Sequence, residues 1–299
     1  MNKELLAKKI QNVEEGFNAY MPEESGYAKT VCEAMNYSLM AGGKRLRPLF
    51  MYEMYQILGG TEEALIRPFM MAMEMIHTYS LVHDDLPAMD NDDYRRGQLT
   101  THKKYGEDMG ILTGDALLNM AYETAFLAFD SKGDPARIGQ ALKVLGEKAG
   151  IKGMVGGQVV DVENNGQFVD EETLYYVYKN KTAALIESSL MIGAILAGAD
   201  DEQIAQVEKI GTKIGIAFQI QDDILDVIGE EEVIGKPIHS DEKNEKSTYV
   251  AIHGLEDSKK KVKEYTENGL QRLDNLVVEN KEEQEFLHEL MESLVGREK

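Results

Sequence analysis

The sequence predicts an all-helical protein, and three observations support this prediction. Apolar residues recur at helical spacing along nearly the whole chain of 299 residues. No alternating segment bounded by hairpin turns stands out as a strand, and all six prolines fit helix starts or loops. Turn signals divide the chain into about ten or more helices. With no Ser/Gly/Pro-rich linker and no fixed repeat, we predict a single domain over residues 1–299.

The first and last helices show the clearest periodicity. The stripe Leu6, Ile10, Val13 and Phe17 has spacings of four, three and four, and apolar residues in 286–294 repeat the pattern. Residues 67–82 and 204–228 are apolar on most faces, which is typical of helices in the middle of a bundle. Turn signals fall between the helices, at 22–26, 42–43, 59–61, 86–93, 131–134, 164–167 and 229–240.

The charge balance excludes some partners. The formal net charge is -21, so the chain as a whole is repelled by nucleic-acid phosphates. We expect most of the acidic side chains to lie on solvated helix faces. In so acidic a chain, an anionic substrate needs a local basic site or a bound cation. The one cysteine, Cys32, permits no intramolecular disulfide. The sequence contains no signal peptide and no apolar run of membrane-spanning length, and we expect a cytoplasmic protein without a membrane span.

Aspartates cluster towards the ends of both central helices. Asp84 and Asp85 end the first helix, just before Pro87, and Asp90 follows in the loop. The second helix carries Asp222, Asp223 and Asp226, at spacings of three and four that place carboxylates on one face.

These positions are unfavourable for anions, because a helix C-terminus carries partial negative charge and like charges four apart repel. One such cluster could be a solvated helix end, whereas two predict a cation between them. Carboxylates without thiols or paired histidines suit Mg²⁺, which completes its shell with water and substrate phosphate. Asp92 and Asp93 are assigned to the solvated loop.

The scarce basic residues gather beside glycine loops and alternate with the aspartate clusters. This order suits a polyanion held by Mg²⁺ on one side and by arginine and lysine on the others. A nucleotide is not favoured, because the P-loop pattern GxxxxGK[ST] is absent. The four groups are Lys44, Arg45 and Arg47 in GGKRLRP; Arg95 and Arg96; Lys179 and Lys181 before Thr182; and Lys236, Lys243 and Lys246.

Two histidines lie near the first cluster. His77 is two turns before Asp84 on the same helix face. The sequence is equally consistent with a buried core histidine and with a substrate contact. For His83, beside the cluster, we favour a cationic cap on the helix C-terminus.

An ordered set of motifs resembles the trans-isoprenyl diphosphate synthases, from roughly residue 25 onward. The motifs are GGKRLRP, EMIHTYSLVHDDLPAMDNDDYRRG, TGDALL, GMVGGQVVD, KTAALI, FQIQDDILD and GK…SD…EKSTY. The resemblance implies the isoprenoid synthase fold, an all-α bundle around a deep central cavity, and a homodimer. It also implies head-to-tail condensation of isopentenyl diphosphate with an allylic diphosphate.

The resemblance also implies roles for individual residues. Asp84 and Asp90 would bind two Mg²⁺ and Asp222 a third, supported by Asp85, Asp223 and Asp226. Arg95, Lys181, Lys236 and Lys246 would hold the allylic diphosphate; Lys44, Arg47, His77 and Arg96 would hold isopentenyl diphosphate; Thr182 and Gln219 would face the reacting carbons. His239 stands where family members often have glycine, and Arg297 resembles a C-terminal basic residue, although a solvated tail is the simpler interpretation.

Tyr79 bears on the length of the product. It lies five residues before Asp84, roughly 7.5 Å along a helix, beside the small Ser80. The similarity to bacterial enzymes with tyrosine here implies farnesyl diphosphate as the product, with geranylgeranyl diphosphate as the alternative. A class I terpene cyclase shares the fold but has no use for GGKRLRP as a second diphosphate site. A non-catalytic synthase subunit usually lacks an aspartate cluster, and both clusters are intact here.

Overall fold

The computed structural model describes residues 2–228 and 247–296 and confirms the all-α prediction. Contacts between Cα atoms divide the chain into two compact units. The N-terminal unit comprises residues 2–49 and 62–138, and the C-terminal unit comprises residues 50–61 and 139–299. The expectation of one domain over residues 1–299 stays a prediction. Within the part of the chain described, no helix has the length and apolar character needed to cross a membrane.

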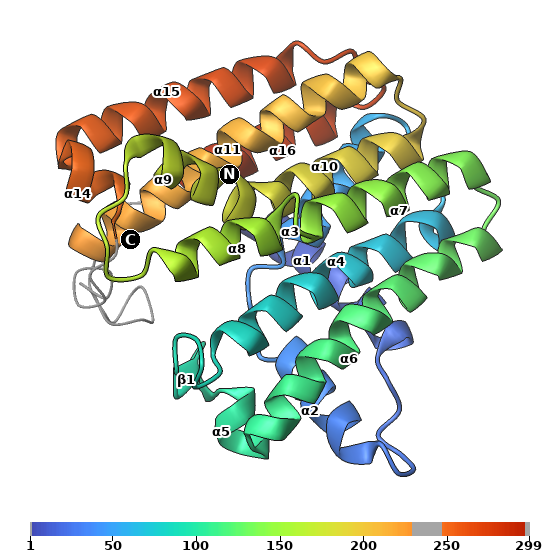
Figure 1. Cartoon of the computed structure of the whole chain (residues 1–299). Coiled ribbons are helices and arrows are strands. Elements are labelled where there is room, and N and C mark those ends of the chain that lie inside the picture. Colours follow the sequence, from blue (N-terminus) through green and yellow to red (C-terminus); the bar gives the residue numbers. More distant parts are fainter. Residues whose placement is uncertain (1, 229–246, 297–299) are drawn as a thin grey trace. The chain divides into compact units, whose positions relative to one another are not determined.

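The N-terminal unit is built around one buried helix, α4 (Figure 1). Helix α6 runs alongside α4 and makes the largest helix contact of this unit (Figure 1). In chain order the elements are α1 Lys3–Phe17, η1 Asn18–Tyr20, α2 Lys29–Leu39, the start of α3 Leu46–Ile57, α4 Glu63–Asp84, β1 Tyr94–Arg95, β2 Gln98–Leu99, α5 Thr101–Tyr105, α6 Glu107–Phe126, η2 Leu127–Asp130 and the start of α7 Pro135–Ala149.

Helix α4 is apolar on most faces, as the sequence predicted. Nearly every side chain from Leu65 to Val82 is buried, and the buried Glu74 is the one carboxylate among them. Such a helix is held in place by packing on all sides. Its C-terminal end therefore presents Asp84 at a fixed position.

A short β-hairpin follows the first aspartate cluster, where the sequence had indicated no strand. Tyr94 pairs with Leu99, and Arg95 pairs with Gln98. Arg96 and Gly97 have φ of 54° and 76°, so both central residues of the turn lie in the left-handed region. Such turns match the twist of the strands, but their usual signal is Asn-Gly or Asp-Gly. The Arg-Gly turn lacks that signal, and its two-residue strands are too short to show alternation.

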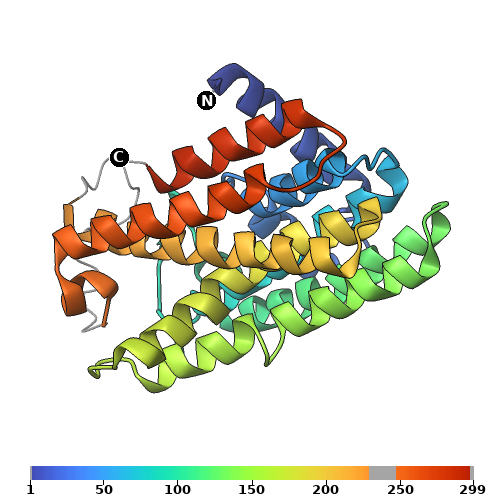
Figure 2. The ribbon, with the colours of Figure 1, turned by 90° about the horizontal axis from the view of Figure 1, so that it is seen from above.

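The C-terminal unit is built around the long helix α11, along which α15 runs (Figure 2). Its elements are the remainder of α3 and α7, then α8 Met154–Glu163, α9 Glu171–Val177, η3 Tyr178–Ala183, α10 Ala184–Ala197, α11 Asp201–Ile228, α14 Tyr249–His253, α15 Leu255–Asp274 and α16 Lys281–Val295.

Helix α11 comes close to the segment before α10 because of a glycine. A Cβ at Gly215 would lie 2.4 Å from the Cβ of Ala183, which no side chain could tolerate without a shift. The two backbones therefore pack directly on each other. This approach places the residues one and two turns further along α11, Gln219 and Asp223, beside the neighbouring η3.

Candidate active site

The end of α4 brings Asp84 and Asp90 together. The backbone N–H of Asp90 donates to the carbonyl oxygen of Asp84 at 2.8 Å, so the loop folds back over the helix end. Within residues 2–228 and 247–296, no three His, Cys, Asp or Glu side chains lie close enough to hold a metal ion by themselves. Mg²⁺ ordinarily takes one or two carboxylates and adds water and substrate phosphate. The oxygen donors present at this helix end fit that kind of binding.

Asp85 is turned towards the hairpin. It is buried, and the Nε of Arg95 donates to both of its carboxylate oxygens, at 2.8 and 2.9 Å. Burial raises the pKa of Asp85, although Arg95 works in the opposite direction. Burial also opposes the charge of Arg95, but the hydrogen bonds that Arg95 donates to Asp85, with the carboxylate charge, raise the pKa of Arg95. The observed partner of Asp85 is thus Arg95, and its role in supporting a metal stays a prediction.

The loop residues Asp92 and Asp93 are exposed, as expected for a solvated loop. The side chain of Asp93 forms a surface ion pair with Lys103 at 2.8 Å. The backbone carbonyl of Asp92 accepts hydrogen bonds from Thr100 Oγ1 at 2.8 Å and pairs with His102 Nε2 at 2.9 Å. These contacts fix the loop against α5.

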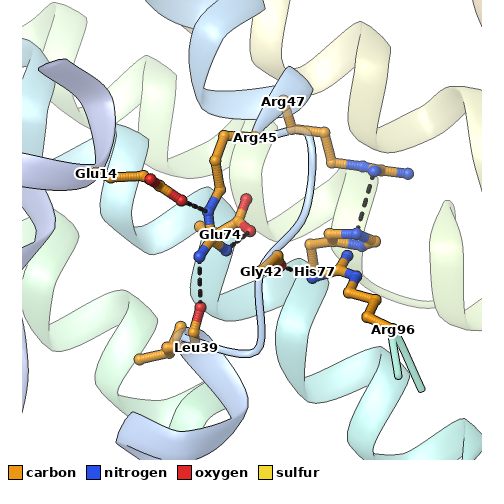
Figure 3. A network of polar contacts seen from close by, with 8 residues as sticks. All are labelled: Glu14, Leu39, Gly42, Arg45, Arg47, Glu74, His77 and Arg96. Carbon is orange, nitrogen blue, oxygen red and sulfur yellow. Dashed lines mark hydrogen bonds and ion pairs between the residues drawn. The ribbon is translucent and has the colours of Figure 1, made fainter. Parts of the chain in front are cut away.

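Three residues of the predicted site for isopentenyl diphosphate, Arg47, His77 and Arg96, lie close together in the N-terminal unit (Figure 3). Nη1 of Arg47 lies 3.4 Å from Nε2 of His77. From the hairpin, Arg96 donates to the carbonyl oxygen of Gly42. Gly43 has φ of 132°, and a Cβ there would lie 2.6 Å from the Arg96 guanidinium. The glycine pair therefore lets Arg96 approach the loop, and Lys44, which is exposed, follows directly.

The charges around this site favour an anion. Burial, and then the neighbouring guanidinium groups led by Arg47 and Arg96, lower the pKa of His77 well below 6.5. His77 is accordingly neutral near pH 7, and its Nε2 accepts from Arg47, because a guanidinium can only donate. Burial and the nearby arginines also lower the pKa of Arg96. Cations held this close to one another are stabilised when an anion binds between them.

In the C-terminal unit, Lys181 and Thr182 lie on η3, a single π-helical segment. Such segments are rare overall but are often found at functional sites, and the sequence pattern did not predict one. Lys181 Nζ lies 2.6 Å from Oδ2 of Asp161 on α8. Thr182 Oγ1 donates to Gln219 Oε1 at 2.7 Å. The structure therefore brings Thr182 and Gln219 together, and their position facing the reacting carbons stays a prediction.

Asp223 faces the interior of this unit. It is buried, and its Oδ2 accepts from the Tyr178 hydroxyl and, at 3.0 Å, from the backbone N–H of Tyr249. Its Oδ1 accepts from Gln219 Nε2 at 3.2 Å. Asp223 thus anchors the start of α14 and orients Gln219. Asp222 and Asp226 lie on the last turns of α11 and are partly buried.

A cavity of about 120 Å³ lies within the C-terminal unit. Its lining includes Asp161, Lys181, Thr182, Gln219 and Asp223. The pairs Lys181–Asp161 and Thr182–Gln219 therefore line the same cavity.

Tyr79 lies on the side of α4 that faces α6. Its side chain is 6% exposed, and burial, followed by Tyr122 and Asp84, raises its pKa to about 12. Its ring meets the ring of His83 edge to face, with centroids 5.9 Å apart. The neighbouring Ser80 donates to the carbonyl oxygen of His77 at 2.8 Å.

His83 lies in the last turn of α4, and its interpretation as a cationic cap there stays a prediction. Its Nε2 lies 3.1 Å from the carbonyl oxygen of Ile111 on α6. Gly114 leaves the space for the ring, since a Cβ there would lie 2.0 Å from Nε2. His83 therefore links α4 to α6. Lys236, His239, Lys246 and Arg297 lie outside the described residues.

Comparison with known proteins shows the family of the chain. The polyprenyl synthetase family model matches residues 28–292. The chain is 42% identical to the farnesyl diphosphate synthase of Geobacillus stearothermophilus over 276 residues, covering 92% of each. It is 43% identical to the geranylgeranyl diphosphate synthase of Cyanophora paradoxa over 257 residues, covering 85% of this chain and 83% of the relative.

A solved structure is also similar. The geranyltransferase of Helicobacter pylori, complexed with magnesium and isoprenyl diphosphate, has a TM-score of 0.86 and 31% identity, over 97% of this chain and 96% of the other. The fold and these relatives define an isoprenoid synthase. The chain belongs to the polyprenyl synthetase family, and it is a prenyltransferase.

Proposed function

We propose that this prenyltransferase condenses isopentenyl diphosphate head-to-tail with dimethylallyl diphosphate and then with geranyl diphosphate, giving farnesyl diphosphate in a Mg²⁺-dependent reaction. The observation that carries the proposal is the basic site formed by Arg47, His77 and Arg96, beside the Gly42–Gly43 loop. A diphosphate that binds there needs no metal, whereas the allylic diphosphate is assigned to the aspartates. Two separate sites for two diphosphates are what a condensation requires.

Roles are assigned to the predicted residues on this basis. Asp84, Asp90 and Asp222 hold Mg²⁺, three ions in all, with support from Asp85 and Asp226. Bound Mg²⁺ supplies positive charge that stabilises the pyrophosphate leaving group. Arg95, Lys181, Lys236 and Lys246 hold the allylic diphosphate, and Lys44, Arg47, His77 and Arg96 hold isopentenyl diphosphate.

The protein's own groups guide the reaction after binding. Arginine and lysine donors stabilise the negative charge that develops as the allylic C–O bond breaks. The oxygens of Thr182 and Gln219 face the allylic cation, whose carbon forms a new bond with the terminal double-bond carbon of isopentenyl diphosphate. A proton is then lost to the departing pyrophosphate. A dry cavity protects the cation from water.

Three alternative functions differ from this proposal in the substrates that they use and the products that they form. A geranylgeranyl diphosphate synthase would carry the same reaction one step further, and the relative from Cyanophora paradoxa bears that name. A class I terpene cyclase would consume the allylic diphosphate without isopentenyl diphosphate. A non-catalytic synthase subunit would turn over neither substrate.

The test is incubation with labelled isopentenyl diphosphate, dimethylallyl diphosphate and Mg²⁺, followed by dephosphorylation and chromatography. We expect labelled farnesol. Labelled geranylgeraniol would assign the longer product, a product without label would indicate a cyclase, and no product would indicate the subunit. A matched incubation without dimethylallyl diphosphate controls for background.

We also propose that the protein is a homodimer, that it is cytoplasmic, and that each chain has one polyprenyl synthase domain. Helix α6 supports the dimer, because Ile111, Leu112 and Phe126 are 44%, 50% and 54% exposed on it, and a large exposed apolar face commonly marks an interface. We propose that a second copy of this chain covers this face. Light scattering should give twice the monomer mass, and Phe126→Glu should lower it; a monomeric wild type would contradict the dimer.

A further inference from the structure

Arg45 lies inside the basic motif but away from the site that the motif forms. From the same loop, Arg47 extends to His77, whereas Arg45 extends in the opposite direction (Figure 3). Its side chain is 1% exposed. Arg45 is therefore a buried guanidinium in a segment where Lys44 is exposed and Arg47 is partly buried.

The Arg45 guanidinium meets three parts of the N-terminal unit. Nη1 lies 2.6 Å from Oε1 of Glu74 on α4, and Nε lies 3.0 Å from Oε1 of Glu14 on α1. Nη2 donates to the carbonyl oxygen of Leu39, the last residue of α2, at 2.7 Å. Every nitrogen of the guanidinium thus has an acceptor on a different helix (Figure 3).

Burial makes these contacts necessary. An isolated buried cation is very unfavourable, and here burial opposes the charge, but Glu74 and Glu14 raise the pKa of Arg45. The backbone of Arg45 has φ of 48°, a left-handed conformation that a residue with a Cβ rarely adopts. Such a conformation persists where the surrounding contacts over-determine it. The three acceptors supply that constraint.

The same two segments carry both the buried network and the basic site. Glu74 and His77 are three residues apart on α4, so they lie on neighbouring parts of one helix face. Arg45 and Arg47 are two residues apart in the loop and the start of α3. The ion pair between Arg45 and Glu74 consequently sets where Arg47 lies relative to His77.

We propose that Arg45, held by Glu74 and Glu14, is a positioning residue for the diphosphate of isopentenyl diphosphate. It fixes the left-handed loop and places Lys44 and Arg47, and it does not itself touch the substrate. The inference rests on the proposed function, because it concerns the site assigned to that diphosphate.

A purely structural role of Arg45 would change stability without a selective effect on one KM. A second buried ion pair in the chain serves as a matched control. In the C-terminal unit, Lys148 forms a buried pair with Glu187 and an ion pair of 2.6 Å with Glu208. The Glu187 side chain is 1% exposed. Glu187→Gln should lower the melting temperature without a selective effect on either substrate.

The experiment compares KM for isopentenyl diphosphate, KM for geranyl diphosphate, kcat and melting temperature across variants. In Arg45→Met/Glu74→Met, apolar side chains replace a buried ion pair, a change that often preserves stability. We expect its KM for isopentenyl diphosphate to rise about tenfold or more, the range for losing a hydrogen bond to a charged group, with the other KM within about twofold.

Two milder variants keep the test informative if the double variant does not fold. Glu14 is 37% exposed, so Glu14→Gln should fold. It should raise the same KM about threefold, because the neutral amide holds the guanidinium less strongly. Arg45→Lys should retain the charge but lose the three-way geometry, and raise the KM as well. Arg47→Ala shows the effect of removing a direct contact.

Equal changes in both KM values, or a change that merely follows the melting temperature as in Glu187→Gln, would overturn the positioning role. A double variant with wild-type KM for isopentenyl diphosphate would also overturn it. These outcomes leave the proposed function intact. By contrast, a wild-type enzyme that forms no condensation product would overturn the proposed function itself.

Discussion

Thr182 Oγ1 donates a hydrogen bond of 2.7 Å to Gln219 Oε1, joining η3 to α11. The contact depends on the close approach of Gly215 to Ala183, one turn before Gln219. Asp223 fixes the other end of the amide, because its Oδ1 accepts from Gln219 Nε2 at 3.2 Å. The Thr182 hydroxyl oxygen and the Gln219 carbonyl oxygen are thus held together on the lining of one cavity.

Thr182→Val should therefore lower kcat more than it raises either KM. Valine has nearly the same shape but lacks the hydroxyl, so the cation loses an oxygen and Gln219 loses its donor. We expect about a tenfold to hundredfold decrease in kcat, the range for one lost hydrogen bond to a charged group. Steady-state kinetics give the result, and Thr182→Ser should restore most of the activity. A valine variant with wild-type kcat would show that this oxygen does not face the reaction.

The aspartates should divide into two groups. Asp84→Ala and Asp222→Ala should each lower kcat by about a hundredfold or more, as expected when charge stabilisation of a leaving group is lost. Asp93→Ala serves as the control, because its side chain is 59% exposed and pairs with Lys103 on the surface. Exposed pairs are worth about 0–1 kcal/mol, so its kcat should stay near wild type. Similar losses in all three variants would mean that the metals are placed wrongly.

Tyr79→Ala should lengthen the product and keep the enzyme active. Removing the ring opens apolar space beside α4, and each CH₂ that a longer product buries gains about 0.8 kcal/mol. Because the Tyr79 side chain is 6% exposed, the cavity should also cost about 3–5 kcal/mol of stability. Chromatography of dephosphorylated products at low temperature provides the measurement. An active variant that still stops at farnesol would mean that another residue ends the cavity.

His77 should make stability depend on pH. Its pKa is well below 6.5 in the folded protein, while the unfolded chain has the ordinary value of 6.5. The unfolded state therefore binds a proton that the folded state does not, and stability falls as pH drops through 6.5. This group therefore makes the folded protein less stable at pH 5.5 than at pH 7.5.

Urea unfolding at both pH values checks this contribution. The wild type should lose more stability than His77→Gln, which carries no titrating group at this position. Equal losses in the two proteins would show that His77 takes up a proton in the folded state as easily as in the unfolded chain.

The sequence predicted those features that depend on local pattern. The apolar run before Asp84 predicted a buried helix, and α4 is one. The glycines of GGKRLRP predicted a loop beside basic residues, and Gly43 leaves the space that Arg96 occupies. The resemblance assigned both Thr182 and Gln219 to the reacting carbons, which stays a prediction, and the structure places the two side chains in contact.

Other features depend on partners distant in the sequence and could not be predicted in this way. Arg45 has the same chemistry as Arg47 in the motif, and only the folded positions of Glu14 and Glu74 show that it is buried. Asp223 resembles Asp222, yet Tyr178 and Tyr249 bind it in the interior. The pattern of aspartates gives their spacing along one helix. It does not show which carboxylate accepts a hydrogen bond from a donor on another helix.

Removal of Mg²⁺ tests the central claim most directly. The enzyme is incubated with labelled isopentenyl diphosphate and dimethylallyl diphosphate, first in excess EDTA and then after Mg²⁺ is returned in excess over the chelator. Because the aspartate clusters carry no soft ligands and the substrates are diphosphates, we expect no labelled prenyl product in EDTA and full recovery with Mg²⁺. Undiminished product formation in EDTA would contradict a reaction that depends on Mg²⁺ held by Asp84, Asp90 and Asp222.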